Sequence, residues 1–300
     1  MNLKPLIKSL LNSSNVLGEG PLWHVDQQAL YWVDIVACEL HKFENQRHQI
    51  WQFDKKISAV VETVTGGLAL AISDGVALFN PVSGQLDYIC KLDEDLPNNR
   101  TNDAKVDPLG KFWVGTMSDG EGDQFTQSGR LWSVDKDGKS TRLLDNIGIS
   151  NTLAWDEHRS KFYFADSAMA TIYQFNYDRK NGLIKKQEVF VKLKDKIAPD
   201  GSCIDNDGYL WNCQWDGWRI VRYTPCGNVD LVIKLPVQRP TSCAFGGKNF
   251  TLLYVTSAKL GLTEAELEQQ PQAGDIFVID LAQLGIKAKG SASNLFGNSA

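Results

Sequence analysis

The chain has 300 residues, 43% of them hydrophobic and 22% charged, and a formal net charge of −5. This composition is ordinary for a globular protein and excludes extended disorder. Because acidic and basic residues are interspersed, no basic stripe is available for phosphate groups, and nucleic acids and anionic membranes are excluded as expected partners.

The first residues of the sequence and its cysteines indicate the cellular compartment in which the protein is expected. The apolar run within residues 1–14 is short and interrupted by Lys8, which does not fit a secretory signal peptide, and no apolar stretch approaches the length of a membrane span. The six cysteines show neither a CxxC pair nor zinc-ribbon spacing. We therefore expect a cytoplasmic protein with reduced cysteines.

Short aromatic and β-branched segments predict strands along the whole chain, most of them directly after a turn. In chain order, the strand cores are predicted at Leu30–Val33, Leu68–Ala71, Phe112–Val114, Phe162–Phe164, Leu210–Trp211 and Leu253–Val255. Helical periodicity is nearly absent. The exception is Thr263–Gln269, where a capping pattern predicts one short helix.

A repeated pattern precedes each of these strands: a polar residue, mostly small residues, then an apolar position. It begins at Glu19, Thr65, Asn102, Asn151, Asp200 and Thr241. Successive starts are 46, 37, 49, 49 and 41 residues apart, which favours six consecutive structural units. We expect an all-β, six-bladed β-propeller that forms a single domain over residues 1–300. A two-sheet sandwich with coincidental spacing is the alternative fold.

Propeller topology would bring the six leading positions together at one rim of the central channel. Two of them, Glu19 and Asp200, are carboxylates, and two others are carboxamides. Carboxylates packed this closely without a counter-ion would lose hydration and repel each other. We therefore expect one divalent metal ion on the axis, Ca²⁺ first, with Zn²⁺, Mn²⁺ and Mg²⁺ as the other candidates.

Six segments together carry a family resemblance. They are Leu17–Trp23, Arg100–Pro108, Val114–Met117, Ile149–Leu153, Pro199–Gly201 and Thr241–Lys248. Through these segments the chain resembles the regucalcin/gluconolactonase (senescence marker protein, sugar lactone lactonase) family. The resemblance extends from about Asn15 to Leu281. The resemblance implies a six-bladed propeller, and many family members hydrolyse aldonolactones with a divalent metal.

The resemblance also implies a role for individual residues. The family's metal ligands fall on Glu19, Asn151 and Asp200, and its substrate-contacting arginine and asparagine fall on Arg100 and Asn102. In regucalcin an acidic pair follows the Gly-Thr-Met motif, whereas here the sequence continues Ser-Asp-Gly-Glu. The acid that contacts a substrate hydroxyl is therefore Asp119 or Glu121, and the difference bears on sugar specificity.

These observations predict a metal-dependent lactonase that opens an aldono-1,4- or 1,5-lactone to the aldonic acid. The metal would polarise the carbonyl or activate a water, and Asp200 would act as the general base. Trp215 and Trp218 would either form a wall against the sugar or pack between blades. The expected partner is a small sugar lactone, and the chain is expected to be a monomer or a weak homo-oligomer.

Other readings of the sequence remain. A covalent hydrolase is disfavoured because no Gly-x-Ser-x-Gly elbow occurs and the four histidines fall outside the predicted ring. Two alternatives stay open: a non-catalytic divalent-metal-binding propeller, and another metal-dependent esterase or lactonase on the same fold. The second would need a more apolar cavity than Arg100, Asn102 and Asp119 suggest. The stretch from Asp119 to Asp123 is interpreted as a mobile lid, with a solvated loop as the alternative.

Overall fold

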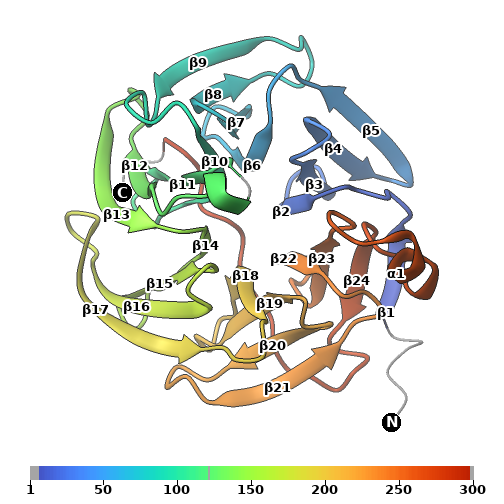
Figure 1. Cartoon of the computed structure of the whole chain (residues 1–300). Helices are drawn as coiled ribbons and strands as arrows, with labels where there is room; N and C mark the ends of the chain where they lie inside the picture. Colours follow the sequence, from blue (N-terminus) through green and yellow to red (C-terminus); the bar gives the residue numbers. More distant parts are fainter. Residues whose placement is uncertain (1–6, 121, 298–300) are drawn as a thin grey trace.

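The computed structural model describes residues 7–120 and 122–297. Within these ranges the regular structure is almost entirely β-strand, and six four-stranded antiparallel sheets surround a central axis like the blades of a propeller (Figure 1). The predicted six-bladed β-propeller is thereby confirmed. No helix in the described part of the chain is both long and apolar enough to cross a membrane.

The first five blades each use four consecutive strands, counted from the axis outwards. Blade 1 contains β2 (Gly18–His24), β3 (Ala29–Asp34), β4 (Glu39–Glu44) and β5 (Arg47–Gln52). Blade 2 contains β6 (Ile57–Glu62), β7 (Leu68–Ile72), β8 (Gly75–Phe79) and β9 (Leu86–Lys91). Blade 3 contains β10 (Asn99–Val106), β11 (Phe112–Ser118), β12 (Gly129–Val134) and β13 (Ser140–Ile147).

The remaining blades follow the same order. Blade 4 contains β14 (Ser150–Asp156), β15 (Lys161–Asp166), β16 (Thr171–Asp178) and β17 (Leu183–Lys192). Blade 5 contains β18 (Ala198–Ile204), β19 (Leu210–Trp215), β20 (Arg219–Tyr223) and β21 (Val229–Lys234). Blade 6 contains β22 (Pro240–Gly246), β23 (Leu252–Ser257), β24 (Ile276–Asp280) and, as its outermost strand, β1 (Ile7–Leu11).

The ring is closed by the pairing of the two ends of the chain. Strand β1 pairs antiparallel with β24, with Ile7 opposite Ile279. Because blade 6 takes its outer strand from the start of the sequence, the circle cannot open without breaking this ladder. Closure also covers the outer edge of β24, which would otherwise expose unpaired backbone groups.

A repeated side-chain motif holds the aromatic second strand of two blades in place. In blades 3 and 5, an aspartate in the first hairpin accepts a hydrogen bond from the indole of the following strand, Trp113 to Asp107 at 3.0 Å and Trp211 to Asp205 at 2.9 Å. The same aspartates accept backbone N–H groups of their own turn. Both tryptophans are fully buried, so the polar end of each indole is satisfied while its rings fill the core.

A bulge near the start of every inner strand shapes the centre of the molecule. The ladder register shifts between Glu19 and Leu22, Ile57 and Ala59, Thr101 and Ala104, Asn151 and Ala154, Pro199 and Ser202, and Pro240 and Cys243. Each bulge adds one residue to the inner strand and re-aims the side chains beside it. The starts of the six inner strands can therefore present polar groups to the axis.

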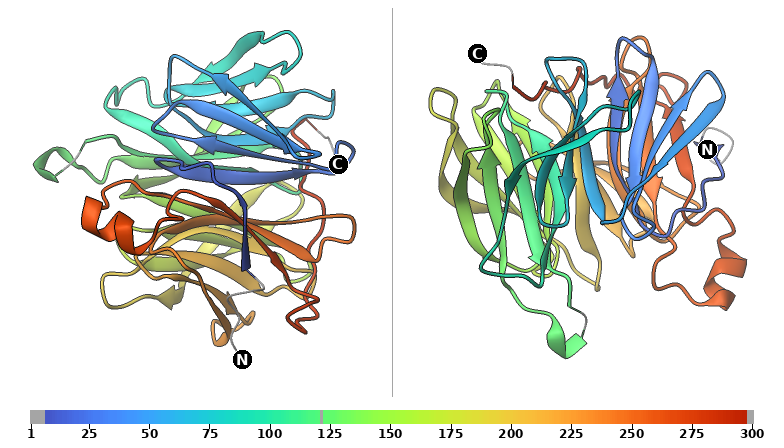
Figure 2. Two further views of the ribbon diagram at one scale, coloured as in Figure 1. Left: turned by 90° about the vertical axis from the view of Figure 1, so that its right-hand side faces the viewer. Right: turned by 90° about the horizontal axis from the view of Figure 1, so that it is seen from above.

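The two faces of the propeller differ. One face carries α1 (Glu264–Gln269) and the short 3-10 helix η2 (Gly122–Gln124), and the segment after β24 crosses the opposite face (Figure 2). Helix α1 begins after Thr263, whose side chain forms a capping box with Glu266, and this confirms the predicted helix. On the opposite face, Phe296 bonds through its backbone to Glu62 and Val64 at the end of β6.

Candidate functional site

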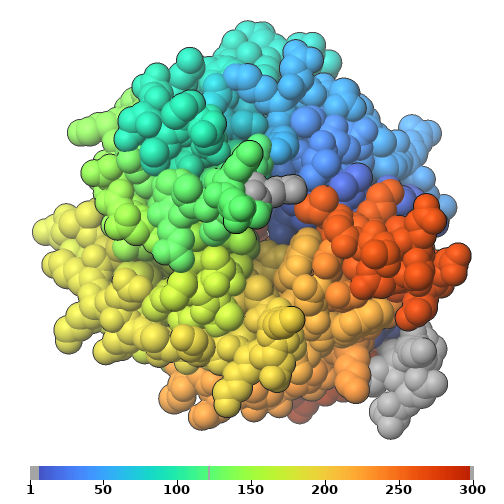
Figure 3. Space-filling model, in the orientation of Figure 1, coloured from blue at the N-terminus to red at the C-terminus, as the bar shows by residue number. Residues whose placement is uncertain are grey.

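A cavity of about 240 Å³ lies on the axis and opens towards the face that carries η2 and α1. The space-filling view shows a hollow near the centre of this face (Figure 3). The polar side chains that line the cavity are Glu19, Arg100, Asn102, Asn151, Ser167 and Asp200. Four of the six predicted ring positions are thus brought together.

The two threonine positions of the predicted ring behave differently. Thr241 is buried at the start of β22, where its hydroxyl bonds to the carbonyl of Gly18 and lies 2.8 Å from the hydroxyl of Thr256. The placement of Thr65 was wrong: it lies in the exposed hairpin turn between β6 and β7. The inner strand of blade 2 begins at Ile57, and the polar residue near its start is Ser58, which is buried and donates a hydrogen bond to the hydroxyl of Thr101.

Two buried carboxyl groups dominate the electrostatics of the cavity. Only 7% of Glu19 and 6% of Asp200 is exposed. Burial, together with the charge of Asp103, raises the pKa of Glu19 to about 8. Burial and the neighbouring Glu19 raise the pKa of Asp200 well above its ordinary value, and the two carboxyl groups share a hydrogen bond. Without a cation, this pair therefore retains a proton at neutral pH.

Asp103 was not singled out from the sequence: it lines a separate cavity beneath the site, and its charge acts on both Glu19 and Asp200. It is 5% exposed, burial raises its pKa, and its Oδ2 atom has no hydrogen-bond partner among the described residues. The signal was present, because Asp103 directly follows Asn102 in the same motif. Strict strand alternation would turn neighbouring side chains to opposite faces, but the bulge in β10 breaks that alternation.

The donor set fits a hard divalent cation. Across residues 7–120 and 122–297, no three His, Cys, Asp or Glu side chains form a group that could hold a metal ion. The axial set reaches three ligands only when the carboxamide of Asn151 is counted with Glu19 and Asp200. All three side chains are buried and offer oxygen atoms, which Ca²⁺ and Mg²⁺ prefer. The unpartnered Oδ2 of Asp103 adds negative charge beside them.

A hydrogen-bond chain fixes the two carboxamides before any ligand binds. The Nη1 atom of Arg100 donates to Oδ1 of Asn102 at 2.8 Å, and Nδ2 of Asn102 lies 3.3 Å from Oδ1 of Asn151. In turn, Nδ2 of Asn151 donates to the hydroxyl of Ser167 at 2.9 Å, and this hydroxyl donates to the carbonyl of Pro199. The chain links blades 3, 4 and 5 and ends beside Asp200.

Of the two predicted substrate-contacting acids, Asp119 lies at the edge of the site. Asp119 accepts hydrogen bonds from Nε of Arg100 at 2.8 Å and from Nζ of Lys56 at 2.7 Å. It lines an open groove next to the axial cavity, and Arg100 lines both. The structure thus places Asp119 as the partner that orients Arg100. Glu121 lies outside the described residues.

The tryptophans and histidines considered in the sequence differ in whether they line the cavity. Trp215 lines the cavity, and the guanidinium of Arg239 lies 4.7 Å from its ring centre. Trp218 is 39% exposed and does not line the cavity. The four histidines lie outside the cavity lining, as expected; His41 and His48 stack on Trp32 in blade 1.

Known proteins share both the sequence and the architecture of this chain. The family model described as SMP-30/Gluconolactonase/LRE-like region matches residues 17–259. Regucalcin from Macaca fascicularis is 34% identical over 287 residues, which cover 94% of this chain and 95% of that protein. Regucalcin from Danio rerio is 34% identical over 286 residues with the same coverage.

Solved structures agree with the sequence comparison. A regucalcin from Agrobacterium tumefaciens, described as a calcium-binding protein, matches with a TM-score of 0.89 and 30% identity over 96% of both chains. A luciferin-regenerating enzyme matches with a TM-score of 0.88 and 28% identity over 97% of this chain and 98% of its own. A gluconolactonase from Xanthomonas campestris shares the fold at a TM-score of 0.72 and 18% identity, over 91% of this chain and 89% of its own. The chain therefore belongs to the SMP-30/gluconolactonase/LRE-like family.

Proposed function

We propose that this chain is a metal-dependent hydrolase that opens an aldono-1,4- or 1,5-lactone to the aldonic acid. The observation that carries the proposal is the axial cavity, in which three buried oxygen ligands lie beside Arg100 and Asn102. Membership of a family that includes gluconolactonases supports the reaction class. Arg100 and Asn102 favour a hydroxylated substrate. Most of the exposed lining is apolar and includes Trp215, so an aromatic lactone is kept as the alternative that the test compares.

The proposed cofactor is one divalent cation held by Glu19, Asn151 and Asp200. Ca²⁺ is the first candidate because it accepts carboxylate and amide oxygens, and the calcium-binding neighbour supports this choice. When bound, such an ion polarises the lactone carbonyl and lowers the pKa of a nearby water. The side chains of Glu19 and Asp200 would then both be ionised, because the cation replaces the proton that they otherwise share.

Asp200 is the proposed general base. Its backbone carbonyl accepts hydrogen bonds from Thr152 and from Nδ2 of Asn212, the latter at 3.0 Å, so its strand is held firmly. The ionised carboxylate takes a proton from the attacking water while the water oxygen bonds to the carbonyl carbon. The bond from that carbon to the ring oxygen then breaks, and Asp200 returns the proton to the departing oxygen.

Arg100 and Asn102 are the proposed substrate-holding residues. Arg100 is half-buried at the cavity wall, and its Nε atom donates to Asp119, so its guanidinium can donate to lactone oxygens with little loss of side-chain entropy. Trp215 offers an apolar surface to the C–H face of a sugar ring. A direct contact of Asp119 or Glu121 with a substrate hydroxyl remains part of the proposal.

The test is a lactone panel run with metal-stripped protein and with protein reconstituted with Ca²⁺, Mn²⁺, Mg²⁺ or Zn²⁺. Aldono-1,4- and 1,5-lactones are compared with an aromatic lactone and a phosphotriester, and acid release is followed at constant pH. We expect turnover of aldonolactones only after reconstitution. Metal binding without turnover of any ester would favour a non-catalytic propeller. Turnover of only the aromatic lactone or phosphotriester would favour another esterase.

A further inference from the structure

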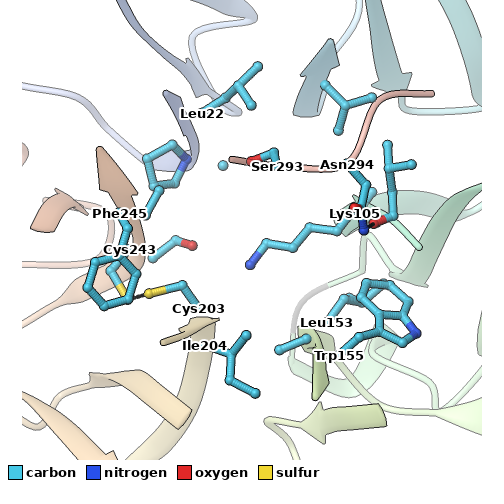
Figure 4. A pocket seen from close by; sticks show the side chains of 18 of the residues that line it. Leu22, Lys105, Leu153, Trp155, Cys203, Ile204, Cys243, Phe245, Ser293 and Asn294 are labelled. Atoms are coloured by element: carbon cyan, nitrogen blue, oxygen red, sulfur yellow. Dashed lines mark hydrogen bonds between the residues drawn. The ribbon is translucent and has the colours of Figure 1, made fainter. Parts of the chain in front are cut away.

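The opposite end of the channel holds a second cavity, of about 170 Å³, that the proposed function does not use (Figure 4). It is lined by residues that follow the bulges of the inner strands, including Lys105 of β10, Cys203 of β18 and Cys243 of β22. Ser293 and Asn294 of the C-terminal segment line it as well, and Nδ2 of Asn294 donates to the carbonyl of Val106.

Two thiols meet in this cavity. The Sγ atoms of Cys203 and Cys243 are 3.4 Å apart, and both cysteines are free thiols. Cys203 is half-buried, whereas Cys243 is buried. A disulfide bond is about 2.05 Å long, so the sulfur atoms would need to approach by only about 1.4 Å. The thiols belong to neighbouring blades, and a bond between them would join β18 to β22.

A positive charge faces the same thiols. The side chain of Lys105 extends into the cavity towards the side that carries Cys203 and Cys243 (Figure 4). Burial raises the pKa of Cys203, and the Lys105 ammonium opposes that rise. Burial also acts to raise the pKa of Cys243, but hydrogen bonds from Cys203 and Cys213 outweigh it and lower that pKa. Of the two thiols, Cys243 is therefore the one whose ionisation its surroundings favour.

We propose that Cys203 and Cys243 form a modification site: a dithiol that small hydroperoxides oxidise to a disulfide across blades 5 and 6. The inference rests on the sulfur–sulfur distance, the cavity that admits the oxidant, and the ammonium of Lys105. It does not depend on the lactonase proposal, because none of these groups lines the axial metal and substrate cavity.

The chemistry balances with hydrogen peroxide as the oxidant. The thiolate of Cys243 attacks one peroxide oxygen, the O–O bond breaks, and the departing hydroxide takes up a proton to become water. Cys203 then attacks the resulting sulfenic sulfur, the S–O bond breaks, and the proton released by Cys203 converts the second hydroxide into water. Two thiols are oxidised to one disulfide, and one peroxide is reduced to two waters.

The first experiment treats the metal-loaded protein with stoichiometric hydrogen peroxide, blocks the remaining thiols, and counts them after denaturation. The count should fall from six to four, with a mass loss of about 2 Da before blocking, as loss of two hydrogens requires. Peptide mapping needs chymotrypsin as well as trypsin, because Cys203 and Cys213 lie in one tryptic peptide. The 203–243 cross-link is expected.

Matched variants locate the bond. Cys203→Ala should abolish the cross-link, whereas Cys213→Ala and Cys226→Ser should retain it. Circular dichroism confirms that each variant is folded. An unchanged thiol count in the wild-type protein, sulfinic acid at Cys243 in place of the disulfide, or a cross-link that uses Cys213 would each overturn the proposal. These outcomes are read on wild-type protein and do not require any variant to fold.

The role of Lys105 has its own readout. Lys105→Met keeps an unbranched side chain of similar length but removes the ammonium. The rate of peroxide oxidation at pH 7 should fall several-fold, because removing the ammonium lowers the fraction of thiolate. The two rates should converge as the pH is raised and the thiols ionise in both proteins. Equal rates at pH 7 would remove Lys105 from the proposal.

Discussion

In the absence of divalent cations, the stability of this protein should fall as the pH rises from 6 to 8. The physical reason is Glu19, whose pKa is about 8 in the folded protein against an ordinary value of 4.5. Between these values the unfolded chain has lost the proton that the folded chain keeps. Raising the pH therefore favours the unfolded state, and the contribution is lost as the pH passes through the folded pKa.

The magnitude follows from the same two values. Each pH unit between them changes the free energy of unfolding by about 1.4 kcal/mol per proton, so the interval from pH 6 to pH 8 accounts for about 2–3 kcal/mol. Because Glu19 is buried, solvent screening does not reduce this figure substantially. A saturating divalent cation should remove the pH dependence, since it holds Glu19 ionised in the folded state.

The assay is equilibrium unfolding in urea with a chelator at pH 6, 7 and 8, followed by the fluorescence of the nine tryptophans. Glu19→Gln is the matched control, because the amide has nearly the same shape and does not titrate. The wild-type protein should lose about 2–3 kcal/mol more than the variant across this range. Comparison with the variant cancels the contribution of histidines. Parallel curves for the two proteins would refute the reasoning.

Three further predictions concern single residues. Asp200→Asn at saturating metal should lower aldonolactone turnover about 100-fold or more, because the general base is lost. The same variant should bind the metal more weakly in calorimetry. Turnover near that of the wild-type protein would exclude Asp200 as the base. Arg100→Ala should chiefly raise KM and leave the Kd for metal unchanged, and a loss confined to kcat would contradict a holding role. Phe296→Ala should lower the free energy of unfolding by about 3 kcal/mol, because Phe296 is buried against Phe112 and the core of blade 2. A change below about 1 kcal/mol would show that the C-terminal segment is not anchored there.

Much of the architecture follows from local sequence. Aromatic and β-branched runs with turn residues between them dictate strands, because alternation and turn geometry act over a few residues. The capping box at Thr263 likewise acts within one turn and placed the helix correctly. The repeat then turns local strands into blades, and equivalent positions in a closed ring must converge. Glu19, Asn102, Asn151 and Asp200 could therefore be predicted to meet at the axis.

The tertiary structure decided what depends on residues far apart in the chain. The start of blade 2 was misplaced at Thr65, because Ser58 of β6 is a weak signal in the sequence and the pairing of β6 with β7 fixes where the strand starts. Asp103 comes close enough to act on the carboxyl pair because of a bulge in β10, which strand alternation does not predict. Asp119 is held by Arg100 and by Lys56, and Lys56 precedes it by 63 residues. Short-range patterns set the elements, but these contacts exist only once the ring has closed and desolvated the groups at its centre.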